Sequence, residues 1–214
     1  MKADNPIARY KNTFPIKVSS TPVQYLTEVQ ANSLTEAFEV WFDKSPSKAK
    51  RKIRGRYWLA YLVLRFTGAR IGEVLRIDDT TDIDFRNAEI KLITLKRQNG
   101  KRKATRIVPV AANVTSEIAT YIAEFPEQRG RVFRLDQGNF RRIFYDRAEE
   151  AGLPKELSHP HILRHTRAVE LLRAGVPVTI VQDMMGHSAL TTTAIYLKIS
   201  GQEAKGILRE KGLI

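Results

Sequence analysis

Hydrophobic residues divide the first third of the chain into helical segments separated by short breaks. Apolar positions recur at helical intervals over 29–42, after a threonine and a glutamine that match a capping box beginning at Thr27. A denser apolar run over 57–66 has the length of a buried helix, and Gly68 interrupts it before one or two further turns over 70–75. The pattern therefore predicts three helical segments, the third beginning just after the break at Gly68.

The hydrophobic period changes to two in the middle of the chain, which is typical of strands. Apolar and polar residues alternate over 83–85, 90–94 and 107–110. Turn signals at 86–87 and 99–100 separate these three stretches. The alternation predicts a small antiparallel sheet of three strands.

Helical spacing returns after Pro109 and continues almost to the end of the chain. Glycines mark the breaks between the apolar stretches. These elements together predict an α+β fold that is mainly α-helical, with a small three-stranded antiparallel sheet. The expected helices cover residues 114–124, 137–151, 161–173, 177–185 and 189–197.

The two ends of the chain differ from its middle. Residues 1–25 contain three prolines, scattered charge and no hydrophobic period, so we interpret them as an extended N-terminal arm. One domain is expected over 26–200, and its 43% hydrophobic content is enough for a buried core. Residues 201–214 are expected to form a C-terminal tail with one more short helix.

The charge balance points to a polyanionic partner. Lys and Arg outnumber Asp and Glu by 36 to 23, which gives a formal charge of +13 and an isoelectric point near 10.1. Counterion release makes nucleic acid the first candidate partner and an anionic membrane the second. The longest apolar stretch, over 57–64, is interrupted at once by Arg65, so no segment is expected to span a bilayer.

The chain contains no cysteine, which excludes a disulfide framework and a thiolate zinc site. Its N-terminus lacks the apolar region of a secretory signal. An intracellular, cytoplasmic protein is the simplest expectation.

Basic residues concentrate in two segments. Seven of the thirteen residues over 44–56 are Lys or Arg, broken by Pro46 and Gly55, and we interpret this run as a basic connection. A second cluster lies on the hairpin over 96–106, between the second and third predicted strands. We expect both segments to contact DNA, the alternative being that they are only solvated charge. The candidate DNA-binding residues are Lys50, Arg51, Lys52, Arg97, Lys101, Arg102 and Lys103.

Candidate chemistry begins with His161 and Arg164 at the start of a predicted helix. At about 100° per residue, the two side chains lie on one side of that helix. The guanidinium offers a planar fork of donors to two phosphate oxygens, and the helix N-terminus adds a partial positive charge. The pair suits a phosphate, although on its own a structural histidine beside a surface arginine is the commoner explanation.

Other polar residues follow a regular order along the chain. Arg70 comes directly after Thr67–Ala69, and Glu73 lies one helical turn later, where it can orient the guanidinium. His187 follows a glycine at the end of an apolar helix, and Tyr196 closes the next one. Taken singly, Arg70 fits an ion-paired surface arginine and Tyr196 a core aromatic.

Taken in order, these residues resemble the tyrosine recombinase, or phage-integrase, family. That family has a Thr-Gly-x-Arg-x-x-Glu box, a lysine on a β-hairpin, a His-x-x-Arg box, a Gly-His box and a tyrosine, in this sequence. Here the boxes run from Thr67 to Tyr196, and the resemblance covers about residues 26–197. Four boxes in the right order are strongly specific.

The resemblance implies a role for each matching residue. Arg70 and Arg164 would hold the non-bridging oxygens of a DNA phosphate. His161 and His187 would hydrogen-bond the same phosphate or assist proton transfer. Tyr196 would be the nucleophile, and its phenol, with an unperturbed pKa of about 10, needs a proton acceptor and a positive field to react at neutral pH.

The hairpin lysine of the family matches Lys96, although Lys101 and Lys103 lie on the same basic hairpin. Lys96 would protonate the leaving 5′-hydroxyl. The implied activity is that of a site-specific recombinase or integrase, which cleaves and rejoins DNA strands through a 3′-phosphotyrosyl intermediate. It would need no cofactor, neither a metal nor ATP.

Other functions compete with this interpretation. The acidic residues over 78–84 are what a metal-dependent nuclease needs, but they also fit the exposed start of a strand. The histidines at 159, 161 and 165 could bind zinc, without a supporting motif. Type IB topoisomerases resemble this family in their chemistry. A basic DNA-binding regulator would use 175–185 and the next helix as a helix-turn-helix.

Most members of the family carry a further N-terminal helical domain that closes a clamp around DNA, whereas only about 25 residues precede the matching region here. The resemblance therefore implies a single-domain form, a fragment, or an accessory protein that supplies the second half of the clamp. The expected partner is double-stranded DNA. The resemblance also implies a monomer or weak dimer in solution and a homotetramer on DNA, with residues 202–214 exchanged between protomers.

Overall fold

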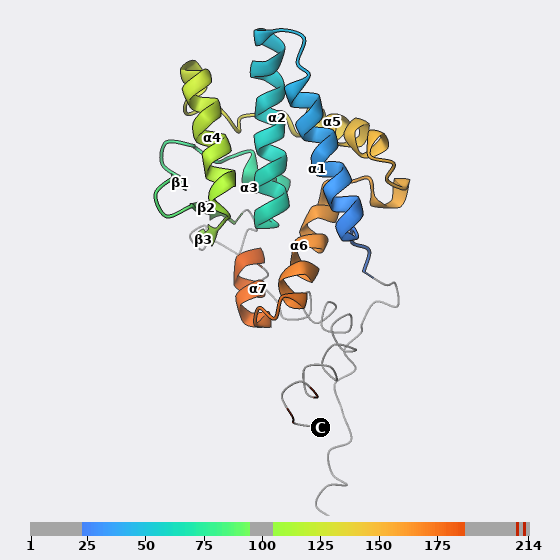
Figure 1. Ribbon diagram of the computed structural model, residues 1–214. Helices are drawn as coiled ribbons and strands as arrows, with labels where there is room; N and C mark the ends of the chain where they lie inside the picture. Colours follow the sequence, from blue (N-terminus) through green and yellow to red (C-terminus); the bar gives the residue numbers. More distant parts are fainter. Residues whose placement is uncertain (1–22, 95–104, 187–208, 210–211, 213–214) are drawn as a thin grey trace, which may run out of the picture.

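A computed structural model gives the fold of this protein and describes residues 23–94, 105–186, 209 and 212 (Figure 1). Short 3-10 helices cover Pro126–Gln128 and Lys155–Leu157. The strands are β1 (Ile83–Asp84), β2 (Glu89–Ile93) and β3 (Thr105–Pro109). The helices are α1 (Glu28–Asp43), α2 (Lys48–Thr67), α3 (Ile71–Val74), α4 (Ala112–Glu124), α5 (Gln137–Glu150), α6 (His161–Arg173) and α7 (Val178–Met185).

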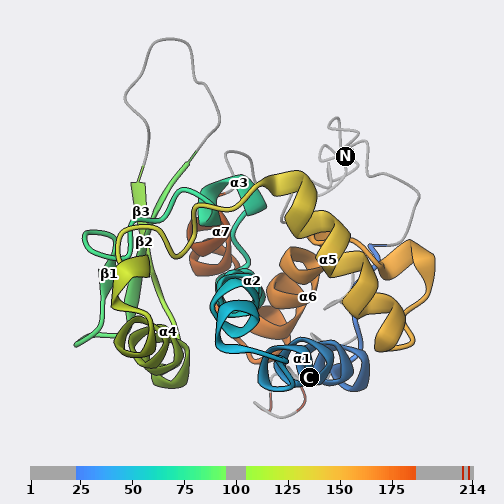
Figure 2. The same ribbon diagram turned by 90° about the horizontal axis from the view of Figure 1, so that it is seen from above.

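Helix α2 lies between two groups of elements. Helices α1 and α6 pack against it, with α5 against α1, and α4 packs against it as well. Figure 2 shows α4 and the sheet on one side of α2, and α1, α5 and α6 on the other. Strand β3 contacts α7, and β2 contacts α3. The sheet therefore meets the helical part of the fold at the end of α2 where α3 and α7 lie.

Helix α2 is longer than the sequence pattern predicted. The Ser47 side chain accepts a hydrogen bond from a first-turn backbone N–H, and Gly68 ends the helix in the left-handed conformation at φ 64°. Most of the basic run over 44–56 is therefore helical, and the expectation of a basic connection there was wrong. Gly55 was interpreted as a break, but close packing is what requires it, because a Cβ there would lie 2.4 Å from the Tyr121 ring.

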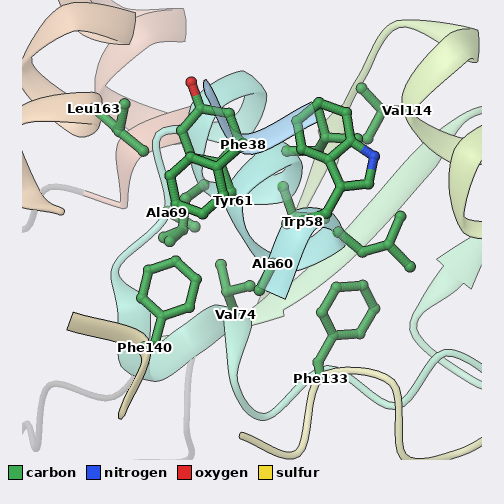
Figure 3. Packing of buried hydrophobic residues seen from close by; sticks show 14 of the residues in the cluster. Phe38, Trp58, Ala60, Tyr61, Ala69, Val74, Val114, Phe133, Phe140 and Leu163 are labelled. Carbon is green, nitrogen blue, oxygen red and sulfur yellow. The ribbon is translucent and has the colours of Figure 1, made fainter. Parts of the chain in front are cut away.

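The core is built around aromatic rings on α1, α2 and α5. The ring centroids of Phe38 and Tyr61 are 4.1 Å apart and the rings are stacked, while Phe144 packs 6.0 Å from Phe38. Figure 3 shows Phe38 and Tyr61 together within the buried cluster. The Tyr61 hydroxyl is 2.8 Å from the Thr35 hydroxyl, so a hydrogen bond satisfies it although the ring is buried. Burial raises the pKa of Tyr61, so its phenol stays protonated.

The sheet has the order β1-β2-β3 with antiparallel pairing throughout, as the sequence predicted. Ile90 pairs with Val108 and Leu92 pairs with Arg106, and the three apolar members of these pairs are fully buried. Ile107, between the two inward residues of β3, is 61% exposed. An arginine therefore occupies an inward position of the sheet, and an isoleucine faces outward.

Several helix predictions are confirmed. Helix α1 begins after a capping box at Thr27, and α6 has the predicted bounds. The arm over 1–22, the helix over 189–197 and the tail lie outside the described residues, except for positions 209 and 212. None of the described helices is both long and apolar enough to cross a membrane.

Replacing Gly55 by Ala should destabilise the protein, although Ala is the better helix former by about 1 kcal/mol. The added methyl group would overlap the Tyr121 ring, and that ring is held in place because its hydroxyl donates a hydrogen bond to the Lys52 carbonyl at 2.6 Å. Overpacking of this kind costs about 1–3 kcal/mol. Urea unfolding followed by circular dichroism should show a lower midpoint.

The matched control for Gly55→Ala is Ser116→Ala on the exposed side of α4, which should change the unfolding free energy by less than about 0.5 kcal/mol. An unfolding free energy of Gly55→Ala at or above the wild-type value would contradict the packing argument.

Candidate active site

Arg164 forms the buried centre of the candidate site. Its side chain leaves the first turn of α6 and only 2% of the residue is exposed. Its Nη1 donates a hydrogen bond to the Gly68 carbonyl at 2.8 Å, and its Nη2 donates to the Met185 carbonyl at 2.6 Å. These carbonyls close the C-terminal ends of α2 and α7, where the partial negative charge of the helix dipole favours a cation. The guanidinium is therefore held at a fixed point between two helix ends.

Arg70 lies beside this point because Gly68 turns the chain out of α2. Its Nη1 donates to the Glu73 Oε1 at 3.1 Å and to the Gly186 carbonyl at 3.4 Å, and its backbone N–H donates to the Glu73 Oε2 at 3.0 Å. The Arg70 side chain remains 30% exposed, while the Glu73 side chain is fully buried. The contact matches the spacing seen in the sequence, where Glu73 follows Arg70 by one turn.

Arg106 also belongs to this cluster, whereas the sequence analysis placed it only at the end of the basic hairpin expected to contact DNA. From β3 it donates a hydrogen bond through Nη2 to the Glu73 Oε2 at 2.7 Å, and only 11% of its side chain is exposed. Burial alone would raise the pKa of Glu73, but the hydrogen bond and charge of Arg106, followed by those of Arg70, hold it below its usual value. One buried carboxylate therefore joins two arginines from different elements.

A pocket of about 460 Å³ opens beside these groups. Arg70 and His161 line it from α3 and α6, and His161 is exposed to solvent there. Two exposed residues of α5, Arg141 and Tyr145, line the same pocket, together with His159. The sequence analysis missed Arg141 and Tyr145, since nothing in their spacing distinguishes them from other surface residues of a helix.

The histidines of this region favour the neutral state. Partial desolvation, followed by the positive charges of Arg164, His159 and Arg70, lowers the pKa of His161. The His165 ring stands edge-on to that of His161 at a centroid distance of 4.7 Å, and desolvation is the main cause that lowers its pKa to about 4. At neutral pH an uncharged His161 can accept a proton.

The remaining candidates of the catalytic type, Lys96, His187 and Tyr196, lie outside the described residues. So do the candidate DNA-binding residues Arg97 and 101–103. The described residues next to these segments contact the site. The Thr94 hydroxyl accepts a hydrogen bond from Arg106, and Gly186, directly before His187, contacts Arg70.

Lys50, Arg51 and Lys52 lie at the N-terminal end of α2, so the structure does not bring them to the pocket. At about 1.5 Å per residue, roughly 27 Å of helix separates Lys50 from Gly68. Arg51 forms ion pairs with Asp43 and Glu124, each at 3.3 Å, and Lys52 forms one with Glu127 at 3.2 Å. These contacts join α2 to its neighbours, and DNA binding by these residues stays a prediction.

The acidic segment over 78–84 has a structural role in the described fold. The Asp79 carboxylate accepts a hydrogen bond from the Gly130 backbone N–H at 2.9 Å, and Asp82 forms an ion pair with Lys91 at 2.6 Å. Across the described ranges, no group of three or more histidines and carboxylates is arranged to hold a metal ion. The described part of the chain therefore gives no support to the hypotheses of a metal-dependent nuclease site or a zinc site.

Comparison with known proteins places these residues in a family context. The sequence model of the phage integrase family matches residues 24–203. A tyrosine recombinase of Pseudothermotoga lettingae is 36% identical over 155 residues, which is 69% of this chain and 51% of that protein. The chain thus spans about half the length of this curated relative.

Solved structures agree with this match. The crystal structure of a XerA recombinase is 26% identical with a TM-score of 0.67, and the alignment covers 93% of this chain and 66% of that one. The Tn1549 transposon integrase in complex with circular intermediate DNA is 26% identical with a TM-score of 0.57, covering 83% of this chain and 63% of that one.

We expect both histidines to titrate below the usual range in the free protein. Nuclear magnetic resonance titration of ¹⁵N-labelled imidazoles should place the pKa of His165 near 4 and that of His161 below 6.5. Since Arg70 is one of the charges that lower the pKa of His161, Arg70→Gln should raise it. The lowered pKa values favour the folded state above about pH 6.5, and this contribution is lost as the pH falls through the folded-state values.

Arg129→Gln is the control for the titration, because Arg129 is exposed and does not line the pocket. It should leave both pKa values unchanged. A His161 pKa at or above 6.5 in the free protein would contradict the assignment of a neutral imidazole.

Proposed function

The chain belongs to the phage integrase family, and from this membership we propose that it cleaves and rejoins DNA strands as a tyrosine recombinase, with Tyr196 as the nucleophile. The observation that carries the proposal is the convergence of Arg70, Arg164 and His161. Arg70 and His161, from two family boxes far apart in the sequence, line one solvent-open pocket, and the buried Arg164 lies close enough that its charge lowers the pKa of His161. Such a pocket has the donors and the charge that a phosphodiester requires.

We propose that the pocket receives the scissile phosphate. The two guanidiniums supply donors to the non-bridging oxygens, and the N-terminus of α6 adds a partial positive charge. Negative charge grows on these oxygens as the new bond forms. Preorganised donors aimed at them can each contribute roughly 2–4 kcal/mol to the stabilisation of the transition state.

The reaction proceeds as a transesterification. The phenolic oxygen of Tyr196 attacks phosphorus while the 5′-oxygen of deoxyribose departs, and the phenolic proton passes to neutral His161 or to His187, the other histidine hydrogen-bonding the phosphate. Lys96 donates a proton to the leaving oxygen. The 3′-phosphotyrosyl bond conserves the energy of the phosphodiester, so a second 5′-hydroxyl can reverse the step without ATP.

DNA contact extends from the pocket onto α5. Arg141 can pair with a phosphate next to the scissile one, and the Tyr145 ring, 48% exposed, offers an apolar face and a hydroxyl beside it. The basic segment between β2 and β3 supplies further cations. The solved complex of the Tn1549 integrase with DNA supports a DNA partner for this fold.

Assembly follows the same family reasoning. We propose that four protomers act on two duplexes, with residues 202–214 exchanged between neighbours, and that an accessory protein or a further domain completes the DNA clamp. These partners rest on the family alone. An enzyme that acts on DNA inside the cell also fits the cytoplasmic localisation predicted from the sequence.

The first test is covalent capture. The protein is incubated with a library of nicked half-site duplexes, so that the short 5′-hydroxyl fragment dissociates after cleavage and traps the intermediate. Denaturing electrophoresis should show a protein–DNA band, and peptide mapping should place the DNA on Tyr196. Tyr196→Phe should abolish the band and keep DNA binding, because it removes the nucleophile and little surface.

Tyr57→Phe is the matched control and should still form the covalent band. Failure of the wild-type protein with the whole library would overturn the proposal and favour a DNA-binding regulator. Relaxation of a supercoiled plasmid of unrelated sequence, without joining of two duplexes, would instead indicate a type IB topoisomerase activity.

A second test separates the two basic segments. Neutralising Lys101, Arg102 and Lys103 to Gln should weaken binding to a random-sequence duplex and flatten its salt dependence by about 0.9 in the logarithmic slope per lost phosphate contact. The matched triple change of Lys50, Arg51 and Lys52 to Gln should also flatten the slope, as the sequence predicts, and should in addition lower the melting temperature, because it removes three ion pairs.

Fluorescence anisotropy at several salt concentrations measures both triple variants, with the wild-type protein as reference. A flatter slope for the variant in α2 would support DNA contact by the basic run, as the sequence suggested. An unchanged slope for the variant at 101–103 would contradict the proposed role of that segment.

A further inference from the structure

Arg106 makes more connections between elements than the proposed chemistry uses. Its Nε donates a hydrogen bond to the Met184 carbonyl at 2.8 Å, its Nη1 to the Thr94 hydroxyl at 3.1 Å and its Nη2 to the Glu73 Oε2 at 2.7 Å. The acceptors belong to the last turn of α7, the end of β2 and the turn of α3. One guanidinium therefore joins three segments that border the pocket.

The position of Arg106 is unusual for a charged residue. It follows the inward register of β3, opposite buried Leu92, while its neighbour Ile107 faces outward. A charge that is 11% exposed on a core-facing position destabilises a fold unless it is fully paired. Each of the three nitrogens has an acceptor, and the carboxylate of Glu73 is one of them.

We propose, on the basis of the function proposed above, that Arg106 is a positioning residue of the active site: it fixes the Glu73 carboxylate and thereby orients Arg70 toward the phosphate. Its two other bonds hold the segments that lead to Lys96 and His187 at the same point. The guanidinium does not itself touch the reacting atoms in this arrangement.

The two oxygens of the Glu73 carboxylate accept hydrogen bonds from different donors, and this explains why Arg70 depends on Arg106. Oε1 accepts from the Arg70 side chain, while Oε2 accepts from Arg106 and from the Arg70 backbone N–H. Without Arg106, the buried carboxylate keeps only Arg70 as a charged partner within the described residues. The Arg70 guanidinium is then drawn toward both oxygens and away from the pocket, which lowers its share in phosphate binding.

Lysine cannot replace this arrangement. A single ammonium nitrogen cannot occupy the three separate positions of Nε, Nη1 and Nη2, so Arg106→Lys keeps the charge and loses the bridge. The close approach to Gly186 points the same way, because a Cβ at that glycine would lie 2.8 Å from Arg106 Nη1. The guanidinium lies directly against the backbone that leads into His187.

The test compares Arg106→Gln and Arg106→Lys with the wild-type protein on the half-site captured in the covalent assay. Single-turnover formation of the phosphotyrosyl complex should be slower by about 100-fold for Arg106→Gln and about tenfold for Arg106→Lys, as expected for a misplaced catalytic group. Binding of the same duplex, measured by anisotropy, should be nearly unchanged. Arg86→Gln, at an exposed arginine of the turn between β1 and β2, is the control and should react like the wild type.

A double-mutant cycle with Glu73→Gln distinguishes positioning from general loss of structure. Because Arg106 acts through Glu73, the double variant Glu73→Gln/Arg106→Gln should react about as fast as Glu73→Gln alone. The charged groups placed against this carboxylate in the described structure are Arg70 and Arg106, so losing Arg106 raises the pKa of Glu73. The acidic limb of the pH–rate profile should therefore move to higher pH in Arg106→Gln. When Glu73 is already Gln, the further change Arg106→Gln should not move the profile.

The outcomes separate this inference from the proposed function. If the wild-type protein forms no covalent complex, the proposed function fails and with it the role of Arg106. If the wild type reacts and Arg106→Gln reacts equally fast, the inference alone is overturned. The inference would also be overturned if the rate losses of Glu73→Gln and Arg106→Gln multiplied in the double variant. A loss of DNA affinity in Arg106→Gln with an unchanged reaction rate would overturn it as well. Should Arg106→Gln fail to fold by circular dichroism, Arg106→Lys carries the same comparison.

Discussion

The site depends on the burial of one positive charge, that of Arg164, between two helix ends. A guanidinium that is 2% exposed is stable only if its donors are satisfied, and here the carbonyls of Gly68 and Met185 accept from it. The first carbonyl belongs to Gly68 and the second lies directly before Gly186. Both glycines have the left-handed conformation. The chain turns at those glycines, and the turns place Arg70 and the segment after α7 around the buried charge.

Local patterns predicted much of this architecture. The capping box at Thr27, the alternation of the three strands and the glycine after α2 all act through neighbouring residues, so the sequence alone reveals them. Gly55 misled the interpretation because a glycine inside a helix resembles a break. The reason for it, the ring of Tyr121, comes from a residue distant in the sequence.

The candidate site shows the same division between local and long-range information. Arg70 and Glu73 are one turn apart and their contact follows from helical geometry. The buried position of Arg106 at the site was not predicted, because two of its partners lie 33 and 78 positions away in the sequence. The one local signal was a charged residue on the inward phase of β3, a position where burial demands a partner. Nothing in the sequence singled out Arg141 and Tyr145, since their spacing is that of any two exposed residues on one side of a helix.

The long sequence separations in the pocket also bear on how the protein is made. Arg164 bonds to a carbonyl 96 positions earlier and to another 21 positions later, so its guanidinium gains these acceptors only when the ends of α2 and α7 have docked against α6. Contacts of this kind form late in folding, since they carry the entropy cost of closing long loops. A nascent or partly unfolded chain therefore lacks the assembled arginine pair. Under the proposed function, DNA cleavage would thus be confined to molecules that have completed their fold.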